Sequence, residues 1–271
     1  MLGRSGIRVL TGVLIGSVGL LGMWTLVQAA SLYVPGTTGW DVSWPQCNER
    51  LPKGGSFAVV GVNHGIAFSE NPCLVEQLEW ASNLPQGASL YVNLANPGTQ
   101  STRWPEECEA AETVNHPECA REYGRRAAAQ AVSYAEQSAA SVGLDAKQLH
   151  WWLDVELANS WDGAPDANFA SIEGYREYLL SVGITSESVG IYSTPLQWEA
   201  IAGANAPGWS VWVAGARAEK TAKQFCDSSF AGGEVLLVQY FSKGYDGNLV
   251  CGGGSGGNGG GKPSTAGPKN R

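Results

Sequence analysis

The strongest constraint on the fold of this chain is a series of eight β-like segments that alternate with helical patterns. Several segments are apolar on both faces, which is typical of strands covered by helices. The predicted strands are residues 39–44, 57–65, 89–96, 150–157, 188–193, 209–216, 235–241 and 246–251. This alternation favours a (β/α)8 TIM-like barrel of the α/β class.

The last two predicted strands must be joined differently from the others. Only "SKGY", residues 242–245, separates them, whereas a parallel crossover needs about a dozen residues. We therefore expect an antiparallel final hairpin, and so an irregular barrel.

Helical patterns fill the gaps between these strands. Residues 166–182 carry apolar side chains at helical spacing, and Asp166 is the expected N-cap. Thr194 and Pro195 are typical of a cap and a first helical turn. Two further helices are expected at residues 74–83 and 120–142, and a long loop at residues 97–119.

The two ends of the chain fall outside the predicted barrel. Residues 1–30 combine basic residues, an apolar run and small residues, which indicates a signal peptide. The apolar run is also long enough to serve as an uncleaved membrane anchor. Residues 252–271 are rich in glycine and typical of a flexible tail. One domain, residues 36–251, is thus expected outside the cytoplasm, either secreted or tethered to the membrane.

The six cysteines fit an oxidising compartment. Fifteen pairings are possible, and proximity in the sequence is the basis for our choice. The expected bridges are Cys47–Cys73, Cys108–Cys119 and Cys226–Cys251.

The charge and the histidine content limit the partners. The formal net charge is −8, which disfavours nucleic acid and anionic membrane surfaces. The chain has three histidines and no C-x-x-C motif, so we expect no metal site and no other cofactor. We expect a monomer whose contact with the membrane is limited to the possible anchor.

Two carboxylates stand in the apolar segment "HWWLDVEL". Asp154 and Glu156 share one face of the predicted strand, with α-carbons about 6–7 Å apart. Acidic residues are rarely buried without partners, whereas the carboxyl ends of barrel strands form an active-site face. Two like charges this close raise at least one pKa, and glycoside hydrolysis needs one acid that keeps its proton. Calcium binding or an ion pair with lysine or arginine is the alternative.

Polar residues come late in most of the other predicted strands and should meet the two acids in one cleft. Asp41 is the exception, because it comes early in its predicted strand. His64 is either a ligand contact or a hydrogen-bonded barrel residue. Trp161, Trp40, Trp44 and Trp104 are candidates for stacking on sugar rings. The polar residues expected in the cleft are Asn63, His64, Asn93, Asn96, Tyr192, Ser193, Gln239 and Tyr240.

Between Gly39 and Cys251 the chain resembles the family 25 glycoside hydrolases, the bacterial and phage muramidases that cut peptidoglycan. The segment "GWDVSW" is similar to the opening G-x-D-V-S strand of that family, and "LDVE" is similar to its D-x-E strand. The segments "VGIYS" and "VQYFSKGYDGN" are similar to its G-x-Y-(S/T) strand and its closing Q-Y…D-x-N segment.

The resemblance implies an enzyme that acts on cell-wall polysaccharide with retention of configuration. Glu156 would be the general acid, and Asp154 would orient the acetamido group of the substrate as it attacks the anomeric carbon. Asp41 and Asp246 would give electrostatic support. Tyr192 and Tyr240 would line the sugar site.

The second and third predicted strands depart from the family pattern. They read "VNHG" and "YVNLANPG", where the family usually has an (S/T)-E-G ending and a Y-H-F ending. His64, Asn93 and Asn96 thus replace contacts near the substrate. A cell-wall polysaccharide other than peptidoglycan stays open, as does a catalytically inactive glycan-binding protein on the same barrel.

Overall fold

The computed structural model describes residues 33–108, 115–242 and 244–252. The predicted leader, residues 1–30, and all but the first residue of the predicted tail lie outside the described residues. Within the described ranges, none of the helices combines the length and apolar character needed to cross a bilayer.

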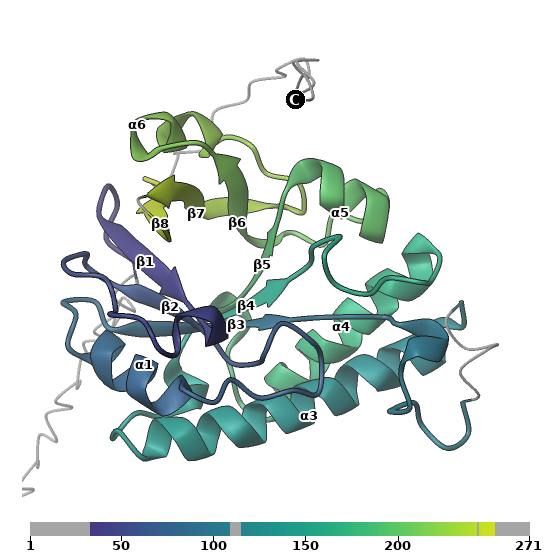
Figure 1. Cartoon of the computed structure of the whole chain (residues 1–271). Helices are drawn as coiled ribbons and strands as arrows, with labels where there is room; N and C mark the ends of the chain where they lie inside the picture. The colour runs from purple at the N-terminus through teal and green to yellow at the C-terminus, as the bar shows by residue number, and fades with distance from the viewer. Residues whose placement is uncertain (1–32, 109–114, 243, 253–271) are drawn as a thin grey trace, which may run out of the picture. The chain divides into compact units, whose positions relative to one another are not determined.

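Eight strands close into a barrel in chain order (Figure 1). Strands β1 to β7 are parallel to their neighbours, while β8 is antiparallel to both β7 and β1. The predicted irregular barrel with a final antiparallel hairpin is therefore confirmed. The strands are β1 (Thr38–Val42), β2 (Ala58–Gly61), β3 (Ala88–Asn93), β4 (Trp151–Asp154), β5 (Val189–Ser193), β6 (Trp209–Ala216), β7 (Gly232–Ser242) and β8 (Tyr245–Val250).

Helices fill the connections between the parallel strands (Figure 1). The α-helices are α1 (Leu74–Ser82), α3 (Pro117–Ala140), α4 (Pro165–Ser181), α5 (Pro195–Ala202) and α6 (Glu219–Ala222). Short 3-10 helices span Trp44–Gln46, Gly98–Gln100, Ala146–Gln148, Ser186–Ser188 and Lys223–Phe225.

The helix starts differ from two of the predictions. Helix α4 is capped by Ala164 rather than Asp166, because Pro165 takes the first helical position, where its missing N–H costs no hydrogen bond. Helix α3 begins at Pro117, so the end of the predicted loop is helical. The cap of α5 is as predicted, since the Thr194 side chain accepts a hydrogen bond from the backbone N–H of Gln197.

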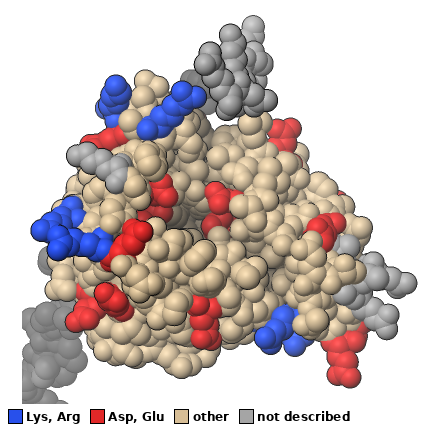
Figure 2. Space-filling view, in the orientation of Figure 1, with Lys and Arg blue, Asp and Glu red and all other residues tan. Residues whose placement is uncertain are grey.

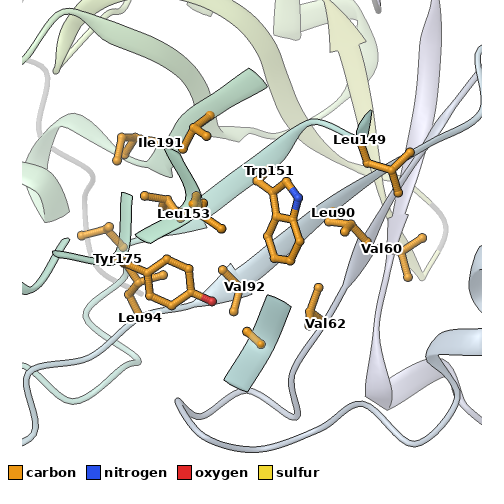
Figure 3. Packing of buried hydrophobic residues seen from close by; sticks show 14 of the residues in the cluster. Val60, Val62, Leu90, Val92, Leu94, Leu149, Trp151, Leu153, Tyr175 and Ile191 are labelled. Carbon is orange, nitrogen blue, oxygen red and sulfur yellow. The ribbon is translucent and has the colours of Figure 1, made fainter. Parts of the chain in front are cut away.

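Alternation along the strands separates two apolar layers. Val60, Leu90 and Leu153 belong to the larger buried cluster, which includes the buried helix residues (Figure 3). Trp152 and Leu237 belong to a second cluster. Its strand residues alternate with those of the first cluster, so their side chains point to the opposite face of the sheet. The second cluster fills the barrel interior, so the residues that continue its face beyond the strand ends reach the mouth of the barrel.

The opposite end of the barrel is closed by aromatic side chains. His150 is buried and its ring centroid lies 4.4 Å from that of Trp152. Burial lowers the pKa of His150 to about 3. The imidazole is therefore a neutral packing group at neutral pH.

All three predicted disulfides are present. Within the described residues no cysteine is free. The Cys108–Cys119 bridge joins the loop after β3 to the first turn of α3, and the Cys226–Cys251 bridge ties the chain after β8 to the segment before β7.

Candidate active site

The four predicted acids line one cavity at the mouth of the barrel, with a volume of about 260 Å³. Figure 2 shows acidic side chains on both sides of a hollow in the face that looks toward the viewer. The acids come from three elements that are far apart in the sequence: Asp41 from β1, Asp154 and Glu156 from β4 and the residues after it, and Asp246 from β8.

Strand direction explains how Asp41 and Asp246 meet. Asp41 is the fourth of five residues in β1, so the expectation that it comes early in its strand was wrong. Asp246 does come early in its strand, but β8 runs antiparallel and so starts at the mouth. The two residues are register partners across the β1–β8 ladder, and partners in such a ladder point to the same face.

Two amide side chains hold the Asp41 carboxylate. Asn248 donates to its Oδ2 at 2.7 Å, and Gln239 donates to both carboxylate oxygens at 3.3 Å. Burial, together with the charge of Asp246, raises the pKa of Asp41 well above its ordinary value, while the two amide donors oppose this rise.

Asp154 is the most buried of the four acids, with 3% of its surface exposed. Its Oδ2 accepts a hydrogen bond of 2.5 Å from Asn93, whereas its buried Oδ1 has no hydrogen-bond partner among the described residues. Burial, and then the charge of Glu156, raises the pKa of Asp154 well above its ordinary value.

Glu156 lies two residues beyond Asp154 on the same face of the chain. Partial burial is the main cause that raises its pKa, the charge of Asp246 adds to the rise, and a hydrogen bond with Tyr192 opposes it. The Tyr192 hydroxyl donates its proton to Gln239 Oε1 at 2.8 Å. The site therefore contains several carboxyl groups that retain protons more readily than free carboxylic acids, as acid catalysis requires.

An asparagine pair supports Asp154 from the neighbouring strands. The Asn63 carboxamide forms two hydrogen bonds with the Asn93 backbone: Asn63 Nδ2 donates to the carbonyl at 3.0 Å, and the Asn93 N–H donates to Asn63 Oδ1 at 3.1 Å. Asn63 is buried, and it extends the β2–β3 pairing beyond the end of β2 at Gly61. The Asn93 side chain is thereby held against Asp154.

The structure places other predicted contacts in or beside the cavity. Tyr192, Gln239 and Asn93 line it. His64 is exposed just outside, with its ring centroid 4.0 Å from that of Trp44, which does line the cavity.

Tyr240, Asn96 and Trp161 are not brought to the cavity, which corrects the predictions for these residues. Tyr240 follows Gln239 on β7, so strand alternation turns it outward into the cluster beneath the helices. Asn96 is fully buried and donates to Asn168 at 2.9 Å. Trp161 packs against the core and donates to the Glu156 carbonyl at 2.8 Å, so it braces the loop behind that acid.

Three neighbours of the acids were not among the candidates from the sequence. Trp212 is a core residue, 1% exposed, that also forms part of the cavity wall. Tyr91 lines the cavity, and the fully buried Asn248 binds Asp41. Period-two alternation marks all three as inward-facing, which is the signal that was available.

The metal alternative receives no geometric support. In the part of the chain that the structure describes, no group of three or more histidine, cysteine, aspartate and glutamate side chains is arranged to hold a metal ion.

Comparisons with known proteins agree with the geometry at the level of the fold. No family model and no curated protein sequence matches the chain. Among solved structures, it is similar to the bacterial lysozyme from Streptomyces coelicolor, with a TM-score of 0.52 and 16% identity over 82% of this chain and 95% of that one. The chain therefore shares the fold of this lysozyme. The spore cortex lytic enzyme of Clostridium perfringens is also similar, with a TM-score of 0.55 and 12% identity over 79% of this chain and 67% of that one.

Proposed function

We propose that this protein is a glycoside hydrolase that cleaves cell-wall glycan, with peptidoglycan as the default substrate. The observation that carries the proposal is the meeting of Asp41, Asp154, Glu156 and Asp246 in one cavity. Two solved structures that share this fold are a bacterial lysozyme and a spore cortex lytic enzyme, which supports the same substrate class.

The acid groups suit a retaining reaction assisted by the substrate. The acetamido carbonyl oxygen bonds to the anomeric carbon as the bond from that carbon to the leaving oxygen breaks. The Glu156 proton passes to the leaving oxygen. A water oxygen then bonds to the anomeric carbon and opens the cyclic intermediate, and the proton that the water loses returns to Glu156. Two inversions at the anomeric carbon give overall retention.

Substrate binding would decide which acid is protonated. Asp154 has an oxygen without a hydrogen-bond partner among the described residues, which leaves acceptor capacity for the acetamido N–H. A donor at this position stabilises the Asp154 carboxylate, and its negative charge favours the protonated form of Glu156. Asp41 and Asp246 add negative charge that stabilises the positive charge on the sugar ring in the transition state.

The test is a Glu156→Gln variant assayed for release of reducing ends from purified peptidoglycan and other envelope polysaccharides. Loss of the general acid should lower turnover by about 10²–10⁴-fold, while the melting temperature and binding to sedimented cell wall persist. Glu199→Gln is the matched control, because Glu199 is exposed on α5 outside the cavity. Full turnover in the Glu156 variant would remove the role assigned to it.

The alternative is a glycan-binding protein that has lost turnover. It is motivated by His64 and Asn93, which replace the usual family residues at the ends of β2 and β3. Binding to cell wall by the unmodified chain, with no bond cleaved across the substrate panel, would favour this alternative.

We also infer that the chain works outside the cytoplasm, secreted or tethered through residues 1–30, and as a monomer. Three disulfides support an oxidising compartment. One chain supplies all four acids, so catalysis needs no second copy.

A further inference from the structure

The acidic cavity has an aromatic wall that the hydrolytic step does not use. Trp44 lines the cavity and is 39% exposed, although tryptophan is largely buried in most proteins. It lies three residues after Asp41, in the segment that follows β1, and it lines the same cavity as Asp154 and Glu156. An exposed indole at the rim of a polar cavity is a binding surface for a ligand with an apolar face.

The backbone around Trp44 is firmly held. Trp44 begins a short 3-10 helix, in which Gln46 Oε1 accepts a hydrogen bond of 2.9 Å from the backbone N–H of Ser43. The buried Gln77 donates to the Ser43 carbonyl at 2.7 Å. The Cys47–Cys73 disulfide fixes the end of this segment to the start of α1. The indole is therefore positioned before any ligand arrives, which lowers the entropic cost of binding.

The loop after β2 supports the indole from one side. The His64 and Trp44 rings are tilted by 36° with centroids 4.0 Å apart. Gly65 follows with a φ of +73°, and a Cβ there would come within 3.2 Å of Trp44 Nε1. Glycine thus allows both the backbone turn and the close approach of the indole. Because His64 covers part of one indole surface, the surface left for a ligand is the one that faces the cavity.

The other three candidate tryptophans, all within the described residues, are engaged elsewhere and do not line the cavity. Trp40 donates to the Gly54 carbonyl at 3.0 Å. Trp104 is 8% exposed and donates to the Gly98 carbonyl. Trp161 donates to the Glu156 carbonyl.

We propose that Trp44, backed by His64, is a stacking platform for a pyranose ring. This ring is the neighbour of the sugar whose glycosidic bond is cleaved at Glu156. This inference rests on the proposed function and adds a specificity determinant to it. A β-linked N-acetylglucosamine has equatorial substituents, so its ring presents an apolar C–H face to the indole while its polar edge meets the carboxylates. A sugar with an axial substituent on that face would be excluded.

The test measures binding of a β-1,4-linked N-acetylglucosamine tetramer and of purified peptidoglycan to the full chain carrying Glu156→Gln, so that turnover does not interfere. Adding Trp44→Leu should weaken binding by about 10–100-fold, because the stacked surface is lost. Trp44→Phe keeps an aromatic face and should retain most of the affinity. Trp40→Leu is the control, because Trp40 lies four residues earlier, on β1, and its indole is outside the cavity. Melting temperatures check the fold of each variant.

The outcomes separate the platform from the proposed function. If the wild-type chain hydrolyses peptidoglycan but Trp44→Leu binds both probes as tightly as its parent, the platform is refuted and the hydrolase stands. If the parent binds and Trp44→Leu weakens binding while the wild-type chain cleaves nothing, the platform stands and the hydrolase falls. If the parent binds neither probe, the platform is refuted, and the hydrolase is refuted as well if the wild-type chain cleaves nothing.

Discussion

Replacing Asn63 with alanine should destabilise the fold more than any ordinary loop substitution. The change removes two hydrogen bonds to the Asn93 backbone, of 3.0 and 3.1 Å, in a position that is 2% exposed. Each buried polar group left without a partner costs about 1–3 kcal/mol, which gives about 2–6 kcal/mol in total.

The space beside Asn63 decides where in this range the result falls. A void of about 10 Å³ already borders Asn63 and Asn93. It is at the limit of what one water needs, which is about 10–15 Å³. Deleting the carboxamide enlarges the void enough for a water to bond to the exposed backbone groups. We therefore expect a loss near the lower end, about 2–3 kcal/mol.

The assay is urea unfolding, followed by the shift of the midpoint at constant m-value. Asn83→Ala is the matched control, because Asn83 also donates one hydrogen bond, to the Glu79 carbonyl at 2.7 Å, but is exposed. The control should change the stability by no more than about 0.5 kcal/mol. Equal effects of the two substitutions would refute the role of Asn63 as an extension of the sheet. Turnover per folded molecule should also fall in the Asn63 variant, since Asn93 would no longer hold Asp154 in place.

Two buried titratable groups predict opposite pH dependences. The pKa of Asp154 is raised on folding, so its ionisation destabilises the fold as pH rises above about 4. Asp154→Asn should then stabilise the protein at pH 7, and melting curves should show that this gain disappears as pH falls below about 4; a variant less stable than the parent at pH 7 would contradict this. The pKa of His150 is lowered to about 3, so its stabilising contribution is complete above about 6.5 and is lost as pH falls toward 3. His150→Phe should reduce the acid-induced loss of stability by up to about 4–5 kcal/mol, and an unchanged pH profile would refute a neutral buried imidazole.

Most of the barrel could be predicted because its signals are local. Strand periodicity, helix caps and the short connection before β8 each depend on a few neighbouring residues. The four-residue connection excluded a parallel crossover, and β8 is indeed antiparallel. The disulfide choice also succeeded, since all three bridges join cysteines that are neighbours in the order of the sequence.

The incorrect and missing predictions at the site have different causes. Tyr240 was assigned to the sugar site through a family motif, although alternation allows only one of Gln239 and Tyr240 to face inward. Asn96 and Trp161 lie beyond the strand ends, where strand alternation no longer sets side-chain direction, and they form an isolated bridge to each other. Asn248 holds a carboxylate 207 positions away, and no local pattern reports such a contact.

The amino-acid sequence by itself determined the number and polarity of the strands, the helices between them and the presence of paired acids on one strand face, because backbone hydrogen bonding and side-chain alternation act over a few residues. Only the tertiary structure decided which acids share a cavity and how strongly each holds its proton. The pKa of a carboxyl group depends on its burial and on its neighbours. Here the decisive neighbours arrive from β1, β3, β4 and β8 once the barrel has closed.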